Sequence, residues 1–285
     1  MIGISKSFFL KLIILLFIFL AIDKCAGIVL NYLFAKCKAG VSYQEYNIIN
    51  KTDQKLLIFG NSRASFTYVP EIFTNELGLS TYNTGNEGIG IYYYYAVLLA
   101  NLERYKPEMI VLEIDYHDIY EGGGRYGPDV LKRLTPFYGK ISDEFDSLLI
   151  RNWYDPFIFQ VNLYKYNNNF FHILTGHIKS IRPNFNGYRP AYGEWPQKMR
   201  IFEEQTLKVD PDKLFCIEKF IQKAQRNNIK VVLTISPYYM IMPDDLFKPL
   251  EKLALIYDIN MYNHTDDMRL IRSRSEEHTS ELQSQ

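Results

Sequence analysis

The sequence predicts an α/β domain built on a parallel sheet that is covered by helices on both faces, with one transmembrane helix before it. Three observations lead to this fold class. Short apolar runs alternate with segments of helical period between residues 55 and 265. The runs are continuously apolar, as expected for strands that are buried on both faces. A long apolar stretch also opens the chain, before any of these strands.

Composition narrows the functional class. The 285 residues suffice for one large domain or two small ones, and 47% of them are hydrophobic, which excludes a disordered chain. The 32 basic and 32 acidic residues cancel, so the basic excess of a nucleic-acid-binding protein is missing and no nucleic-acid partner is expected. The three cysteines, Cys25, Cys37 and Cys216, form neither a disulfide framework nor a metal-ligand spacing.

Residues 1–34 are predicted to be a membrane anchor and residues 35–54 a polar connector. The run Phe8–Ile22 is almost entirely apolar, but its 15 residues are short for a span of about 20. The apolar character resumes after Asp23 and Lys24, so residues 8–30 are interpreted as an uncleaved signal anchor, with a cleaved signal peptide as the alternative. Basic residues flank both sides and do not fix the orientation. We expect an extracytoplasmic domain because one N-terminal anchor before a whole domain is the usual export arrangement.

The elements of the domain follow in order. Five strands are predicted, at residues 55–60, 80–85, 106–116, 229–237 and 259–263. Four helices with apolar residues at helical spacing alternate with them, at residues 69–78, 90–105, 210–228 and 243–259. Residues 119–209 break the alternation, and we interpret them as an insertion over the site with one helix near 141–151.

The last residues are predicted not to belong to the domain, which is assigned to residues 55–271. The segment Arg274–Ser284 has no hydrophobic period and resembles a translated sequencing-library adapter. We therefore expect residues 272–285 to be an artefactual tail that replaces the C-terminal part of the domain. A genuine polar tail is the alternative.

Chemistry in parallel sheets gathers where the strands end. The first strand ends in "GNSR", which places Ser62 on a tight strand-to-helix turn. There it is a candidate nucleophile, although Ser62 or Asn61 acting only as a turn and cap explains the same pattern. The third strand ends in "DYHD", where Asp115 and Asp118 suggest either a carboxylate pair or, as we favour, a cap and a turn.

The second strand ends in "NTGNEGIG". Its glycines allow close approach of a ligand to the backbone, and Asn83 and Asn86 add amide donors of the kind that stabilise an oxyanion. A phosphate-binding loop is disfavoured because no Gly-Lys-Ser/Thr follows.

Together, "LLIFGNSRASFTYVPEIF", "TYNTGNEGIGI" and "PEMIVLEID" resemble the SGNH/GDSL hydrolase superfamily. The closest likeness is to its membrane-anchored bacterial branch with Gly-x-Ser-Arg at the nucleophile. The resemblance implies a three-layer α/β/α, flavodoxin-like fold. It implies esterase, deacetylase or acyl-transferase chemistry, often on cell-surface glycans, with no metal and no organic cofactor.

By this resemblance Ser62 is the nucleophile, and the backbone N–H groups of Ser62 and Gly85 are oxyanion donors. His117 stands where the family has an asparagine donor, so Asn86 is a possible substitute. His117 is then a structural or substrate-contacting residue, which we favour, or the general base. Arg63 either binds a substrate carboxylate or anchors the turn to an acidic side chain.

The family's base lies in an Asp-x-x-His motif near the C-terminus, and no such motif occurs before residue 272. We expect it beyond residue 271, and we expect the chain as it stands to lack activity. The function expected is that of an exported serine esterase or acyl-transferase acting on acyl, above all acetyl, esters of cell-surface glycans. A non-catalytic protein of the same fold in surface-polysaccharide binding or assembly is the alternative.

Overall fold

The computed structural model describes residues 6–122, 126–178, 185–190, 200–201, 207–238, 240–243, 245–265 and 267. The chain divides into two compact units. The first combines residues 1–47 with 132–182, and the second combines residues 48–131 with 183–285.

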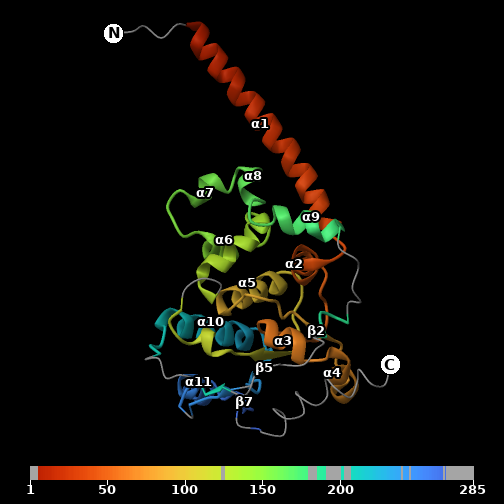
Figure 1. The fold of residues 1–285 in the computed structure, drawn as a ribbon, viewed down its shortest axis with the longest axis vertical. Helices are drawn as coiled ribbons and strands as arrows, with labels where there is room; N and C mark the ends of the chain where they lie inside the picture. Colours follow the sequence, from red (N-terminus) through yellow and green to blue (C-terminus); the bar gives the residue numbers. More distant parts are fainter. Residues whose placement is uncertain are drawn as a thin grey trace. The chain divides into compact units, whose positions relative to one another are not determined.

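The second unit contains the predicted parallel sheet (Figure 1). Its strands are β1 (Leu56–Phe59), β2 (Thr81–Asn83), β3 (Met109–Glu113), β5 (Lys230–Ile235) and β7 (Asn260–Asn263). They are all parallel in the order β2-β1-β3-β5-β7, so all five predicted strands are confirmed. Counted along the chain, the order is 2-1-3-4-5, which is the flavodoxin-like order.

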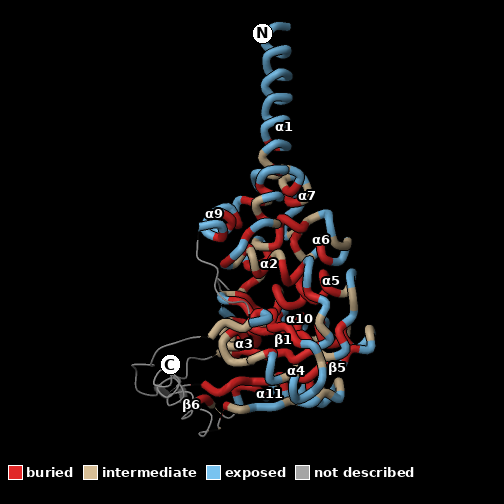
Figure 2. The backbone as a smooth tube through the Cα atoms, turned by 90° about the vertical axis from the view of Figure 1, so that its right-hand side faces the viewer, coloured by how far each residue is buried: buried red, intermediate tan, exposed pale blue. Residues whose placement is uncertain are grey.

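Helices cover both faces of this sheet. They are α3 (Ser62–Thr67), α4 (Pro70–Leu77), α5 (Ile91–Leu102), α10 (Pro211–Arg226) and α11 (Lys248–Ile256). On one face α10 packs against α5 and α11, and the Phe59 ring meets the Phe220 ring edge-on at 5.2 Å. On the other face Leu56 and Ile58 pack with Phe73 of α4. Figures 1 and 2 show the strands between α10 and α4, which confirms the predicted α/β layering.

Short elements were not predicted. The two-residue strands β4 (Arg200–Ile201) and β6 (Met240–Ile241) pair with each other, and α11 begins five residues later than the apolar period suggested. Two residues are too few to display a period of two, so no sequence pattern could reveal this pair.

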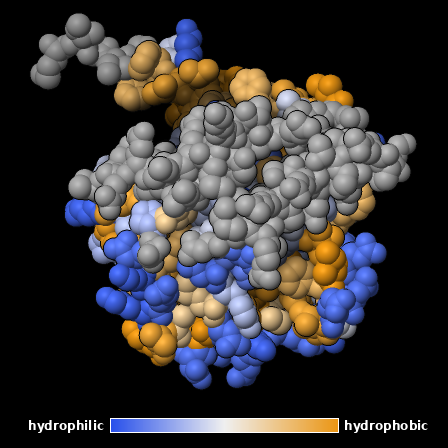
Figure 3. Space-filling model, turned by 60° about the horizontal axis from the view of Figure 1, so that its bottom comes forward, coloured by the Kyte–Doolittle hydropathy of each residue, from blue (hydrophilic) through white to orange (hydrophobic). Residues whose placement is uncertain are grey.

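On the face shown in Figure 3, hydrophobic side chains lie in patches separated by hydrophilic ones.

The first unit begins with α1 (Lys6–Ala35), a helix long and apolar enough to cross a membrane. Residues 6–22 are exposed on all sides (Figure 2). Buried side chains begin at Asp23 and recur at Gly27, Leu30 and Phe34, so one stripe of the helix packs on the unit. A membrane-spanning helix is thus supported, whereas its retention and its orientation stay predictions.

The predicted polar connector contains a helix, α2 (Gly40–Asn50). The sequence of α2 is polar, but its Glu45 is fully buried. The Glu45 carboxylate accepts hydrogen bonds from Arg133 Nε at 2.6 Å and from the Asn169 side-chain amide at 3.0 Å. Burial raises the pKa of Glu45 although both partners oppose this effect. A buried ion pair carries no hydropathy signal, which is why this helix was missed.

The predicted insertion, residues 119–209, contributes to both units. Its elements are η3 (Pro128–Phe137), α6 (Asp143–Leu149), α7 (Asp155–Ile158), α8 (Asn162–Lys165) and α9 (Phe170–Ile178). Helix α6 confirms the helix predicted near 141–151. In the first unit the Phe34 ring of α1 packs on Phe137 and Tyr166, at 5.6 and 6.1 Å. Residues 185–190 belong to the second unit, and residues 272–285 lie outside the described residues.

Candidate active site

Ser62 is the first residue of α3, directly after the turn that ends β1. The cap of this helix is Asn61, whose Oδ1 accepts the Arg63 N–H at 2.8 Å. Gly60 has φ +157°, and a Cβ there would lie 2.5 Å from that of Ala64, so the turn requires glycine. Ser62 itself is half-buried, and the structure records no hydrogen bond from its hydroxyl to another described residue. The capping role therefore falls to Asn61 and not to Ser62.

Arg63 ties this turn to the strands beside it. Its Nε donates to Glu113 Oε1 at 3.1 Å, and its NH2 group donates to the carbonyls of Ser236 and, at 3.0 Å, Pro237. The guanidinium lies 3.5 Å from the centre of the Tyr238 ring. These contacts with the protein favour the anchoring role of Arg63 over the binding of a substrate carboxylate.

Glu113 is the last residue of β3 and is fully buried. Burial raises the pKa of its carboxyl, and the charge of Arg63 opposes this rise. A buried carboxylate is tolerated only when it is paired. Glu113 was not predicted as a site residue, although an acidic residue at the end of an apolar run is a usable signal.

Asp115 and His117 form a second pair of an acidic and a basic side chain, just after β3. Asp115 Oδ1 lies 2.6 Å from His117 Nδ1 and also accepts the His117 backbone N–H at 3.0 Å. Burial of Asp115 by itself would raise the pKa of the carboxyl, but the His117 hydrogen bond and the Arg63 charge outweigh it and lower that pKa. An ionised Asp115 makes Nδ1 the donor of this bond, and in the neutral form of the imidazole this tautomer leaves Nε2 as the acceptor. The ring stacks on Tyr126 at 4.3 Å and 24°.

Asp118 is a cap and not half of a carboxylate pair. Its Oδ1 accepts the Ile91 N–H at the start of α5 at 2.8 Å, and its Oδ2 accepts the Asp115 N–H at 3.1 Å. Complete burial raises the pKa of Asp118 well above its usual value. Asp115 and Asp118 together form the capping box of η1 (Tyr116–Asp118), as the cap-and-turn interpretation predicted.

Lys213 of α10 binds the backbone of the turn that carries His117. Its Nζ donates to the carbonyls of His117 and Tyr120 at 2.8 and 2.7 Å. It is buried, and burial lowers its pKa. Sequence reasoning missed Lys213, although it precedes Cys216 and Ile217 by three and four residues and therefore lies on the apolar face of the helix.

The predicted oxyanion donors differ in their availability. The Gly85 N–H already donates to Asn83 Oδ1 at 2.9 Å. A Cβ on Gly85 would lie 2.6 Å from the Ser65 nitrogen, so glycine is needed for this approach. Asn86 is buried, its N–H donates to Gly60 O at 3.3 Å, and its Nδ2 has no partner among the described residues. Asn86 is therefore the predicted side chain that keeps an uncommitted donor next to the turn.

Residues 185–190 of the insertion cover part of this region. Arg189 donates from its backbone to Ser65 O at 3.0 Å and from Nε to Ser65 Oγ at 2.9 Å, and it pairs with Glu87 at 3.2 Å. Asn186 O accepts the Asn83 N–H at 2.8 Å. This segment thus fixes the loop after β2 against α3.

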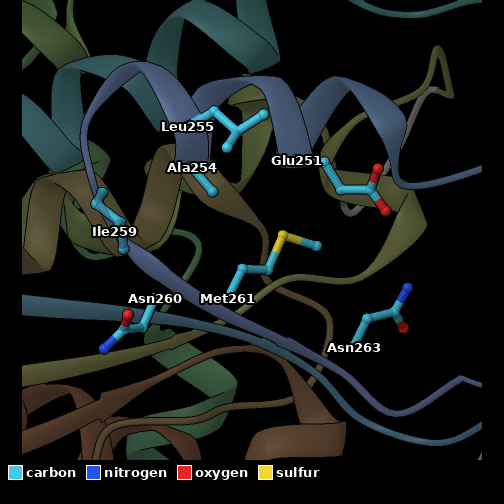
Figure 4. Close-up of a pocket in the computed structure, with 7 residues that line it drawn as sticks. All are labelled: Glu251, Ala254, Leu255, Ile259, Asn260, Met261 and Asn263. Atoms are coloured by element: carbon cyan, nitrogen blue, oxygen red, sulfur yellow. The ribbon is translucent and has the colours of Figure 1, made fainter.

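These side chains gather at the switch point of the sheet. From β1 the chain moves outward to β2, and from β3 it moves the other way to β5, so a crevice is expected at the carboxyl ends of β1 and β3. Ser62 follows β1 and His117 follows β3, and the two strands are neighbours with Phe59 beside Leu112. A separate hollow between α11 and β7, into which Met261 points, lies at the sheet edge (Figure 4).

No model of a known protein family matches the chain, and no curated protein matches it. Fold and site together therefore define a class by their geometry alone. The second unit is a parallel α/β domain of flavodoxin-like strand order. It carries a half-buried serine after β1 and a histidine held by a buried carboxylate after the neighbouring central strand, β3.

Proposed function

We propose that this chain is a membrane-anchored serine esterase or acyl-transferase with Ser62 as its nucleophile. The observation that carries the proposal is the Asp115–His117 pair after β3, the strand beside β1, whose following turn leads to Ser62. A serine hydroxyl needs an adjacent base, and a base is effective when a third group orients it. Arg63 Nε lies 3.6 Å from Asp115 Oδ2. Because Arg63 directly follows Ser62, this contact links the turn that carries Ser62 to the Asp115–His117 pair.

The proposed reaction uses few groups. Ser62 Oγ attacks the ester carbonyl carbon while His117 Nε2 accepts the hydroxyl proton. The ionised Asp115 stabilises the imidazolium that results, since it already holds Nδ1. When the tetrahedral intermediate collapses, the proton passes to the departing alcohol and the acyl group stays on Ser62. Water, or a sugar hydroxyl in a transferase, then attacks the acyl-enzyme by the reverse sequence.

The oxyanion is proposed to be held by the Ser62 N–H and by Asn86 Nδ2, the buried donor without a described partner. Gly85 joins them only if its N–H exchanges its bond to Asn83. The resemblance to SGNH/GDSL hydrolases supports acyl esters of an exported glycan as the substrate class. It also supplies a competing base, the Asp-x-x-His pair expected beyond residue 271.

A fluorophosphonate probe on the full chain in detergent tests the nucleophile. We expect Ser62→Ala to abolish labelling and Ser147→Ala, at an exposed serine of α6, to leave it unchanged. With His117 as base, His117→Ala lowers the labelling rate by about 10²- to 10⁴-fold. Labelling of Ser62 at an unchanged rate in His117→Ala would instead assign the base to another residue.

One observation favours the non-catalytic alternative. The Gly85 N–H that the resemblance assigns to the oxyanion is occupied by Asn83. A glycan-binding or assembly protein of this fold needs no free donor there. If wild type and Ser62→Ala hydrolyse a panel of acetylated sugars equally, the esterase proposal fails and this alternative stands.

A further inference from the structure

The first unit exposes large apolar side chains on its short helices α7 to α9. Four are especially open to solvent: Trp153 at 82%, Phe157 at 70%, Phe171 at 75% and Ile178 at 83%. Others on the same segment are exposed too: Tyr154, Leu163, Tyr164, Phe170 and Leu174. Soluble monomers rarely expose so many apolar side chains within one short segment, and such surfaces indicate a partner or a membrane. We refer to residues 153–178 as the aromatic platform.

This platform is fixed to α1 where the fully exposed part of that helix ends. Asp23 accepts hydrogen bonds from Asn162 N at 3.0 Å, Asn162 Nδ2 at 2.9 Å and Leu163 N at 2.9 Å. Gly27 permits this contact, because a Cβ there would lie 2.4 Å from Asn162 Cγ. Figures 1 and 2 both show α7 and α9 near the end of α1 from which the rest of the unit continues.

The length of the free part of α1 is the second observation. Residues 6–22 are exposed all round, and 17 residues at 1.5 Å each measure about 25 Å. The hydrocarbon core of a bilayer is about 30 Å thick. Beyond Asp23 one stripe of the helix packs on the platform, while Ile28, Val29 and Tyr32 remain exposed on the other side. Apolar surface thus continues past Asp23, to the level of the platform.

We propose that the aromatic platform is a second membrane contact, which lies in the lipid interface beside α1. Its occupant is a phospholipid bilayer, in which Trp153, Phe157 and Phe171 lie between headgroups and acyl chains. Tryptophan and tyrosine favour this depth because one part of the ring is apolar and another binds water. The three N–H groups that donate to Asp23 also support a location near lipid, since a carboxylate there needs polar partners.

Tryptophan fluorescence of the full chain in phosphatidylcholine vesicles tests the proposal. The sequence has two tryptophans, so Trp195→Phe leaves Trp153 as the sole emitter. Lipids brominated in the acyl chains are expected to quench Trp153 emission by about half, and aqueous iodide is expected to quench it little, as for interfacial aromatic residues. The matched control is Trp153→Phe/Trp195→Phe/Ser147→Trp, which moves the emitter to exposed α6 of the same unit. It should show the opposite pattern.

Two outcomes overturn the proposal. Quenching of Trp153 by iodide but not by brominated lipid shows that the platform lies in water. Protection from both quenchers shows that a protein, or a second copy of this chain, covers it. A second variant, Phe171→Cys in a Cys25→Ser background, gives an independent result with a polarity-sensitive thiol label. A spectrum typical of water in vesicles refutes the lipid contact even if tryptophan data are ambiguous.

Discussion

Replacing Arg63 by methionine removes the cation that the fully buried Glu113 faces. The change keeps most of the aliphatic side chain but deletes the bond to Glu113 Oε1 and the donors to two carbonyls of the loop after β5. Removing one partner of a buried ion pair typically costs about 3–5 kcal/mol. The Arg63 charge now opposes the rise in the Glu113 pKa that burial causes, so the variant raises this pKa further.

The pH dependence of the loss follows from proton binding. An orphaned Glu113 avoids a buried charge by keeping its proton when folded, whereas the unfolded chain releases it above about pH 4.3. Holding this proton costs at most about 1.4 kcal/mol per pH unit above that value, so the loss is small near pH 5 and grows as the pH rises toward the folded-state pKa. The native state then binds more protons than the unfolded state, so the variant loses stability as pH rises between the two pKa values.

Cys216 provides the assay because it is buried in α10, where burial raises its pKa to about 12 and makes the thiol unreactive. In a Cys25→Ser/Cys37→Ser background, a thiol-reactive dye in detergent reports unfolding of the second unit. At neutral pH a loss of 4 kcal/mol corresponds to a Tm lower by about 8–16 °C. Arg63→Met/Glu113→Gln should recover most of this loss. An equal Tm loss at about pH 5 and about pH 8, or a double variant no more stable than the single one, refutes the reasoning.

Two further predictions concern the second unit, the first measured with the same assay and the second by limited proteolysis. Lys213→Met leaves the His117 and Tyr120 carbonyls without their buried donor and should cost about 2 kcal/mol, whereas the exposed Lys252→Met should cost less than about 0.5 kcal/mol; equal losses would contradict the supporting role of Lys213. Gly187→Ala places a Cβ 1.9 Å from Asn83 O at φ +88°, so residues 185–190 should detach from β2 and become cleavable by protease. Gly78→Ala, at φ +66° with no atom within 4 Å, should cost only about 1 kcal/mol and leave this segment protected; protection in both variants would contradict the contact.

The fold was predictable from sequence where burial repeats along the chain. Strand β1 is apolar throughout, β3 and β5 contain the apolar runs Met109–Leu112 and Val231–Leu233, and the helices between them show apolar residues at helical spacing. Prediction failed where polar residues are buried. Helix α2 was not predicted because it buries the charged Glu45, whose charge is compensated by Arg133, 88 residues away in sequence. Such a partner is defined only by the tertiary fold.

The location of the candidate site was predictable from the sequence, but the hydrogen bonds and ion pairs within it were not. Strand ends identified Ser62, Asn86 and His117, since parallel strands deliver their carboxyl ends to one edge. The sequence left two roles open for Arg63, and only its contacts with Glu113 and the loop after β5 favour anchoring. Similarly, no sequence pattern shows that the Gly85 N–H is occupied by Asn83, because the bond depends on the side-chain conformation of Asn83.

The three acids at the end of β3 and just after it hold the groups around Ser62. Glu113 binds Arg63 and so holds the turn from inside the sheet, while Asp115 orients His117 and Asp118 caps α5. Each carboxylate thus fixes a different neighbour, and Asn61 caps α3. The serine hydroxyl is therefore not required for holding the turn together. Among the groups of the candidate site, the half-buried Ser62 hydroxyl and Asn86 Nδ2 are thus two without a partner among the described residues, and they are the two that the proposed mechanism uses.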